Sequence, residues 1–389
     1  MANKDYKTTY NTIRQPLQGV GDSETTDILT VSLIVLFHVR YIFLTILQTR
    51  TIALDALFYL IVLVALCTLK LNKYCLVLVP LVFLSLLNSA AQNIFLILSS
   101  SYIVSVKLPL RKLFKINVIC IICVILSVVL MVKAGIVKEH IGTSRFYING
   151  MIYNPRVRSD MGFGNPNRVA ILVYSLVINL YLLIKKKHQI LFLIAVILGS
   201  YYIYTHTDSR TFILSITCFL LSFFALRSAR MSRLMLKTRM VLFYIPIIFL
   251  IIIIYVSKIR YDDISLEILT SGRLGLFSDF INHCSLKDYL LGTNLINEKT
   301  IDNAYLHLLF SAGIFGLFSM LFLWYKLVSS LDRITLITYP ILISITIYGF
   351  AESIWTMLLC YGNMIIWVMM IKNLILPNEY QQEIRNLTI

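Results

Sequence analysis

Long apolar runs recur along most of this 389-residue chain, and they constrain the fold more than any other feature of the sequence. A helix of about 20 apolar residues can cross the hydrocarbon core of a membrane. Backbone polar groups must be satisfied internally there, so a chain with many such runs is expected to form a helical bundle. We therefore predict an all-α, polytopic membrane protein with about twelve transmembrane helices. The expected spans are residues 28–47, 52–69, 74–88, 90–106, 116–135, 168–184, 189–206, 211–226, 240–257, 303–325, 334–350 and 354–371.

The composition argues against the other classes of protein. Apolar residues make up 58% of the chain and charged residues only 14%, whereas soluble domains have about 45–50% and about 25%. A single soluble enzyme domain is therefore not expected, and disorder is excluded because there is too much apolar surface to leave in water. Residues 1–27 are polar, so no cleavable signal peptide is expected. The seven cysteines are scattered, mostly in apolar runs, and suggest no disulfide framework.

Basic residues in short loops indicate which face is cytoplasmic. Loops 107–115, 185–187 and 227–239 are rich in Lys and Arg and fall on one face of the expected topology. This orientation places both termini in the cytoplasm. The segment from Tyr74 to Val106 fits either one helix or two, and one helix would reverse the side of everything before it.

The expected organisation has three parts. Residues 1–27 and 373–389 form cytoplasmic tails, and residues 28–372 form the transmembrane bundle. Two long outer loops, about 136–167 and 258–302, carry many of the remaining basic residues. The positive-inside rule does not account for this outer excess, although long loops are less bound by it. Arginines clustered beside the membrane indicate an anionic ligand on the outer face.

Four arginines in or beside these loops are candidates for binding that anion. Arg156 and Arg158 alternate, so both point to one side of an extended segment. Arg210 lies in a very short turn between two spans, close to hydrocarbon, where a charge is costly. Arg273 follows Gly272, which allows a close backbone approach, and its guanidinium is a bidentate donor. The alternative is that these charges are solvated or reach lipid headgroups.

Turn residues precede the span that follows the first outer loop. Gly162, Gly164 and Pro166 predict a tight, irregular turn. Asn165 or Asn167 is expected to cap the next helix. The exposed amides at a helix N-terminus can also bind an anion.

The segment Asp302-Asn303-Ala304-Tyr305-Leu306-His307 opens another span. Asp302 and Asn303 are natural N-cap residues. Asn303 and His307 are four residues apart and share a helix face. An ionisable residue inside a membrane is a functional candidate, although a lone histidine is more often a hydrogen-bonded structural residue.

Other kinds of chemistry lack a sequence signal. The histidines, cysteines and carboxylates do not have the spacing of metal ligands. The sequence contains no P-loop, no Gly-x-Ser-x-Gly elbow and no Asp-x-Asp motif. A nucleotide-dependent reaction on the cytoplasmic side is therefore unsupported.

Taken together, these segments resemble the bacterial O-antigen and capsule polysaccharide polymerases, the Wzy family, and the related O-antigen ligases. The resemblance lies in an order of features over about residues 140–320. A Gly-Asn-Pro-Asn segment opens a span, a Ser-Arg follows in a short outer turn, and a Ser-Gly-Arg lies in a large outer loop. An Asp-Asn-x-Tyr-Leu helix start with a downstream Gly-x-x-Gly completes the set.

The resemblance implies a metal-independent membrane glycosyltransferase that uses no cofactor. It implies a multi-pass protein of the bacterial cytoplasmic membrane that acts on the outer face. The substrate would be a repeat oligosaccharide linked to undecaprenyl pyrophosphate, and the growing chain would move onto a new lipid-linked repeat unit. A flippase and a chain-length regulator of the same pathway would be partners, and the product would serve as capsule or lipopolysaccharide O-antigen.

This chemistry gives each candidate residue a role. The leaving pyrophosphate gains charge as the sugar–phosphate bond breaks, and preplaced arginines would stabilise it. We assign this role to Arg156, Arg158, Arg210 and Arg273. His307 is the first choice to accept the proton of the acceptor hydroxyl, because the related ligases carry a histidine in a comparable region; Asp302 and Asp160 are the alternatives. The remaining substrate contacts are assigned to Asn165, Asn167, Asn303 and Tyr305.

Three other functions compete with this interpretation. An O-antigen ligase, which passes the finished chain to the lipid A core, is the nearest. A lipid-linked sugar flippase or another transporter would carry charges deep within many spans, whereas here these are few: Arg40, Asp55 and Glu352. A purely structural membrane protein would leave the outer arginine excess unexplained.

Overall fold

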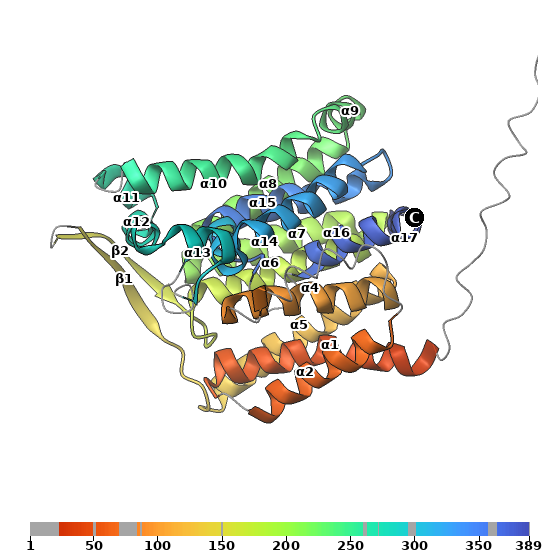
Figure 1. Ribbon diagram of the computed structural model, residues 1–389, viewed down its shortest axis with the longest axis horizontal. Coiled ribbons are helices and arrows are strands. Elements are labelled where there is room, and N and C mark those ends of the chain that lie inside the picture. The colour runs from red at the N-terminus through yellow and green to blue at the C-terminus, as the bar shows by residue number, and fades with distance from the viewer. Residues whose placement is uncertain are drawn as a thin grey trace, which may run out of the picture.

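In the described part of the chain, the computed structural model is a bundle of helices with one β-hairpin at an end, which confirms the predicted polytopic helical fold (Figure 1). The structure describes residues 23–49, 52–69, 84–85, 88–148, 151–259, 263–270, 272–294, 301–356 and 364–388. Its helices are α1 (Ser23–Tyr41), η1 (Ile42–Ile46), α2 (Ile52–Cys67), α4 (Ser89–Lys107), α5 (Leu110–Lys133), α6 (Pro166–Leu183), η3 (Lys186–His188), α7 (Gln189–Thr207), α8 (Arg210–Leu226), α9 (Ala229–Lys237), α10 (Val241–Ile259), α11 (Ile264–Leu269), α12 (Arg273–His283), α13 (Leu286–Leu291), α14 (Ala304–Ser329), η5 (Thr335–Thr338), α15 (Tyr339–Ala351), α16 (Ile365–Ile375) and α17 (Pro377–Thr388).

Seven helices within the described residues are long and apolar enough to cross a membrane, and α8 with α9 makes an eighth if that bent pair is one span. The seven are Ile28–Ile46, Ser89–Lys107, Leu110–Lys133, Pro166–Leu183, Lys186–Thr207, Val241–Ile259 and Ala304–Ser329. Helices α2, α15 and α16 are apolar but shorter. Most of the expected span 74–88 lies outside the described residues, so a total of about twelve stays a prediction.

The two ends of the bundle differ in character (Figure 1). The hairpin and helices α11 to α13 lie at one end, which we call the hairpin end. Helices α9 and α17 lie at the other, which we call the C-terminal end, and α1 also begins there. The expected outer loops therefore share one end, and the described chain begins and finishes at the opposite one.

Both expected loops contain regular structure. Strands β1 (Ile141–Ile148) and β2 (Met151–Ser159) pair antiparallel within the segment expected as the loop 136–167. The hairpin was not predicted, although Asn149-Gly150 between the strands is a strong hairpin signal. The loop 258–302 contains α11, α12 and α13.

A kink in α14 anchors this second segment to the bundle. Gly313 has φ +62°, and a side chain there would put its Cβ 2.1 Å from the carbonyl oxygen of Leu290 in α13. A kink leaves helix carbonyls without their usual partners. The amide of Thr293 donates to the Phe310 carbonyl at 2.6 Å, and Asn88 Nδ2 donates to the Ser311 carbonyl at 3.1 Å. The kink thus joins the start of α4, the end of α13 and α14.

The three tryptophans of the chain lie together and fix the segment after α15. The ring centroid of Trp355 is 5.4 Å from that of Trp324 and 6.2 Å from that of Trp367. Trp367 Nε1 donates to the Trp355 carbonyl at 2.7 Å, and Tyr305 packs against Trp355 with centroids 5.8 Å apart. Buried aromatic pairs of this kind hold a backbone in place, and Glu352 lies three residues before Trp355.

The expected C-terminal tail is instead a helix docked on the bundle. Lys372 is fully buried, and its Nζ lies 2.8 Å from Glu383 and 3.2 Å from Glu379 in α17. Glu383 also accepts a hydrogen bond of 2.7 Å from the backbone amide of Leu110, at the start of α5. A buried lysine must be paired, and here the pairing ties α17 to α16 and α5.

Candidate active site

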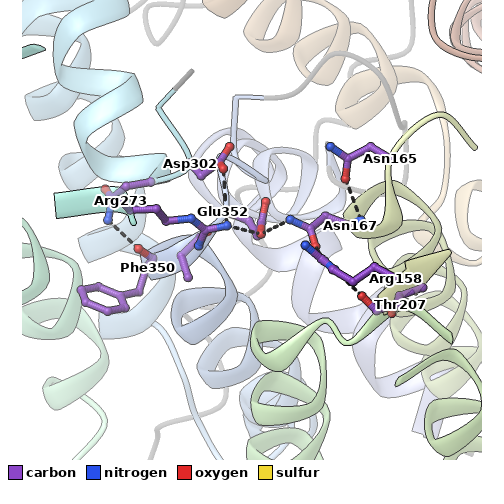
Figure 2. Close-up of polar contacts among 10 residues, drawn as sticks. Arg158, Asn165, Asn167, Thr207, Arg273, Asp302, Phe350 and Glu352 are labelled. Atoms are coloured by element: carbon purple, nitrogen blue, oxygen red, sulfur yellow. Dashed lines mark hydrogen bonds and ion pairs between the residues drawn. The ribbon is translucent and has the colours of Figure 1, made fainter. Parts of the chain in front are cut away.

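A chain of polar side chains crosses the interior of the bundle at the hairpin end. It contains Arg158 from β2, Asn167 from α6, Arg273 from α12, Asp302 before α14 and Glu352 after α15 (Figure 2). We call these five residues the polar cluster. The sequence predicts four of the five as site residues: Arg158, Asn167, Arg273 and Asp302. The five residues come from segments far apart along the chain.

The turn before α6 aims Asn167 into the cluster. Gly162 and Gly164 have φ of +84° and +71°, values that favour glycine. Asn165 is the N-cap, its Oδ1 accepting the Asn167 amide at 2.8 Å, and Pro166 follows at the first helical position. Because Asn165 takes the capping role, the Asn167 side chain contacts the cluster instead.

Arg158 reaches the cluster from the hairpin. Its Nη2 donates to Asn167 Oδ1 at 2.6 Å, and its Nε donates to the Thr207 carbonyl at 2.6 Å. Thr207 is the last residue of α7, so this arginine also satisfies a free carbonyl at a helix end. Arg158 therefore joins β2 to α6 and α7.

Glu352 is the centre of the cluster. Asn167 Nδ2 and Arg273 Nη2 reach its Oε1 from opposite sides, at 2.7 and 3.0 Å (Figure 2). Arg273 also donates through Nη1 to the Ala351 carbonyl at 2.6 Å and lies 3.4 Å from Asp302 Oδ2. Gly272, with φ +78°, immediately precedes this arginine and is the N-cap of α12. Within the described part of the chain, Oε2 of Glu352 accepts no hydrogen bond.

The cluster is buried and balanced in charge. The Glu352 side chain is 3% exposed, whereas those of Arg273 and Asp302 are 18% and 29% exposed, so the cluster opens on the Asp302 side. Burial raises the pKa of the Glu352 carboxyl to about 7, against the opposing effect of Arg273. Arg158 and Arg273 balance Glu352 and Asp302 when both carboxyls are ionised. A carboxyl with a pKa near neutrality, beside two guanidinium groups, is suited to proton transfer at an anion site.

The other proton-acceptor candidates lie apart from these contacts. His307 Nδ1 is 3.0 Å from Ser311 Oγ in α14, and the histidine bonds no residue of the polar cluster within the described chain. Asp160 accepts hydrogen bonds of 2.9 Å from the amides of His140 and Gly162, which organises the end of the hairpin. Asp160 thus has a local structural role in this arrangement.

The remaining candidates also have defined positions. Asn303 is the N-cap of α14, and its Nδ2 donates to the Phe350 carbonyl at 2.6 Å, two residues before Glu352. Tyr305 is buried, with its hydroxyl donating to the Thr346 carbonyl at 2.7 Å. Arg210 is exposed at the start of α8. Arg156 lies in β2 opposite Ser144, but its side chain lies outside the described residues.

Glu352 is the residue that the sequence argument did not assign to the site. In the sequence it is one of the few charges deep within apolar segments. An acidic residue inside a long apolar run is itself a functional signal. This is the sequence feature from which Glu352 could be identified as a site residue. Across the described ranges, no three His, Cys, Asp or Glu side chains group as metal ligands.

The arrangement can bind an anionic group through two guanidinium groups and can accept a proton on a carboxylate. Searches against protein-family models, curated proteins and solved structures found no match to this chain.

Proposed function

We propose that this chain is a Wzy-type repeat-unit polymerase of the bacterial cytoplasmic membrane. It would transfer a glycan from undecaprenyl pyrophosphate to a lipid-linked repeat unit on the outer face. The observation that carries the proposal is the joining of Arg158 and Arg273 through Asn167 and Glu352 at the hairpin end. These arginines belong to the two expected outer loops, whose basic residues predict an anionic ligand.

The arginines suit the leaving group. Cleavage of the sugar–phosphate bond places negative charge on the pyrophosphate, and preorganised cations favour that state over the ground state. At an effective dielectric constant of about 20, two unit charges about 4 Å apart interact by about 4 kcal/mol. Guanidinium groups also bind phosphate oxygens in bidentate geometry. Arg273 is partly exposed, which allows a ligand to reach it.

Glu352 suits the proton that the reaction releases. The acceptor hydroxyl oxygen forms a bond to the anomeric carbon, and the bond from that carbon to the pyrophosphate oxygen breaks with its electron pair leaving on phosphate. The hydroxyl proton passes to the Glu352 carboxylate. This transfer changes the net charge of the two arginines and two carboxyls from zero to +1 as the leaving group becomes more negative. Glu352 therefore replaces His307 as our first choice of proton acceptor.

The first experiment deletes the gene in its host and compares the surface polysaccharide on a gel. A polymerase predicts collapse of the ladder to one repeat unit attached to its final anchor. Loss of attached polysaccharide with accumulation of lipid-linked polymer would identify a ligase instead. An unchanged ladder would overturn the proposal and favour a transporter.

A second experiment tests the site in vitro with purified protein and lipid-linked repeat units. Arg158→Ala and Arg273→Ala are each expected to lower the polymerisation rate by about 10²–10³-fold, as removal of one preorganised donor does elsewhere. Lys138→Ala is the matched control, because Lys138 is an exposed basic residue just before the hairpin and lies outside the polar cluster. Wild-type rates in both arginine variants would refute the pyrophosphate role.

A further inference from the structure

A cavity of about 830 Å³ lies at the C-terminal end of the bundle, opposite the polar cluster. Residues from the start of α7, the end of α8, α9, the segment around η5 and α17 line it. Its size is within the range of small-molecule sites. Nothing in the proposed transferase reaction uses this end of the molecule.

The lining combines an apolar floor with a basic rim. The apolar part includes Tyr181, Phe223 and Leu236. The basic side chains of the lining are Lys186, Arg227, Arg233, Arg333 and Arg385. Among the described residues that line the cavity there is no Asp or Glu. Five positive charges around one cavity favour an anionic ligand.

Two of these charges, those of Arg227 and Arg233, have contacts with uncharged groups only in the part of the chain that the structure describes. Arg227 lies over the Phe223 ring at 4.9 Å and donates to Gln189 Oε1 at 3.3 Å, and Arg233 Nε donates to the Ala229 carbonyl at 3.3 Å. Neither of these two arginines pairs with a carboxylate in the described ranges. Arg385 interacts electrostatically with Asp332, which lies outside the lining.

Helix α9 indicates that this cavity faces a membrane surface. The helix is bent by 115° from α8, and Ser228 caps its start. Its apolar residues Met231 and Leu234 are 40% and 49% exposed, while Arg230, Arg233 and Lys237 recur three and four residues apart. A short helix with exposed apolar residues and a basic face is typical of one lying in the headgroup region.

We propose that this cavity binds the phosphate headgroup of an anionic phospholipid, with the basic rim on the phosphate and the apolar floor beside the glycerol and acyl chains. Basic pockets between membrane helices recognise such headgroups. A free phosphate offers the same charge, but it would not use the apolar floor or the neighbouring α9. The lipid is therefore the source that both features favour.

The test measures lipid binding to the purified full-length protein in neutral detergent by native mass spectrometry. The probes are phosphatidylglycerol and zwitterionic phosphatidylcholine. We expect phosphatidylglycerol to bind at least tenfold more tightly. Each charge removed from the rim should cost roughly fivefold in affinity, so Arg227→Gln with Arg233→Gln should cost about 25-fold. Lys115→Gln is the matched control, because Lys115 is an exposed basic residue near the start of α5 and lies outside the lining and outside α9, and its affinity should stay within twofold of wild type.

Three outcomes would overturn the proposal: equal binding of the two lipids, equal losses of affinity in the double variant and in Lys115→Gln, or equal affinity for soluble glycerol phosphate. The last outcome would assign the cavity to a free phosphate compound instead of a lipid. An unchanged thermal unfolding midpoint without added lipid shows that the double variant is folded. If it does not fold, Arg333→Gln, which changes a loop residue of the rim, provides the same measurement.

Discussion

Glu352→Gln separates the charge of Glu352 from its hydrogen bonds. The side-chain amide of glutamine has an oxygen that can accept from Asn167 and Arg273, as Glu352 Oε1 does at 2.7 and 3.0 Å. The substitution preserves volume and these two contacts. It removes the negative charge and the ability to accept a proton. A loss of activity in this variant therefore reports on the carboxylate itself.

The size of the effect follows from the pKa of Glu352, which burial raises to about 7. Loss of a general base costs about 10²–10⁴-fold, so we expect a deficit of about 10³-fold at pH 8. In the wild type, about nine-tenths of Glu352 is ionised at pH 8 and about one-hundredth at pH 5. The deficit should therefore shrink to about tenfold at pH 5, because the wild type loses its base while the variant has none to lose.

The assay is the initial rate of polymerisation by purified enzyme from pH 5 to 8, for the wild type and Glu352→Gln side by side. The wild-type rate should rise with pH and level off above about pH 7. A deficit that stays constant across this range would refute the proton-acceptor role. So would a variant whose rate at pH 8 is within threefold of wild type.

A stability measurement on the same pair provides a second readout. A raised pKa means that the folded state binds the Glu352 proton more tightly than the unfolded chain does, so this group stabilises the fold increasingly as pH falls from about 7 towards about 4.5. Between pH 8 and 5.5 the gain is about 2 kcal/mol for a shift of this size. The wild type should gain this amount relative to Glu352→Gln, as a rise in the unfolding midpoint. Equal pH dependence in the two proteins would contradict the burial of an ionised Glu352.

Two further predictions concern the elements that hold the site and the C-terminal helix. Gly313→Ala should destabilise the protein by at least about 3 kcal/mol, because alanine is strained at a positive φ and its Cβ would lie 2.1 Å from the Leu290 carbonyl oxygen. The control Gly199→Ala, in open space within α7, should be neutral or stabilise the protein by up to about 1 kcal/mol. Equal unfolding midpoints for the two variants would refute the role of the kink. Lys372→Met should lower the free energy of unfolding by about 3 kcal/mol, mainly because the carboxylate of Glu383 would stay buried without its cation. Limited proteolysis should then cut α17 at protease concentrations that leave the wild type intact.

Hydropathy located the helices because membrane helices satisfy their own backbone and need only local apolar sequence. The expected spans 90–106, 189–206 and 211–226 match α4, α7 and α8 within about two residues at each end. The hairpin was missed because strand pairing joins two segments, neither of which is apolar enough to stand out. The docking of α17 was missed for a related reason, since it depends on Lys372 finding carboxylates in a segment that is polar overall.

The site shows the same division between local and distant information. Residue type and position near a membrane boundary selected Arg158, Asn167, Arg273 and Asp302, and local turn chemistry placed Asn165 as a cap. The sequence did not indicate that Glu352 lies between Asn167, 185 residues earlier, and Arg273, 79 residues earlier. That contact depends on the packing of Trp355 among aromatic residues of other helices, which no local pattern contains.

The charge balance of the polar cluster explains why a carboxylate accompanies the arginines. Two unpaired guanidinium groups buried in a helical bundle would destabilise the fold by several kcal/mol, because each would lose its hydration without gaining a partner. Glu352 and Asp302 remove that cost while no ligand is bound. Glu352 is the more buried of the two, with a side chain that is 3% exposed, and it contacts Arg273 and Asn167 directly, so its protonation removes the negative charge nearest to Arg273. A pyrophosphate bound from the more exposed Asp302 side therefore gains negative charge beside Arg273 in the same step in which Glu352, the counter-ion of that arginine, takes up the acceptor proton. The Glu352 carboxylate would thus have two roles. It stabilises the buried guanidinium groups when no substrate is bound, and its proton uptake during transfer strengthens the binding of the leaving anion.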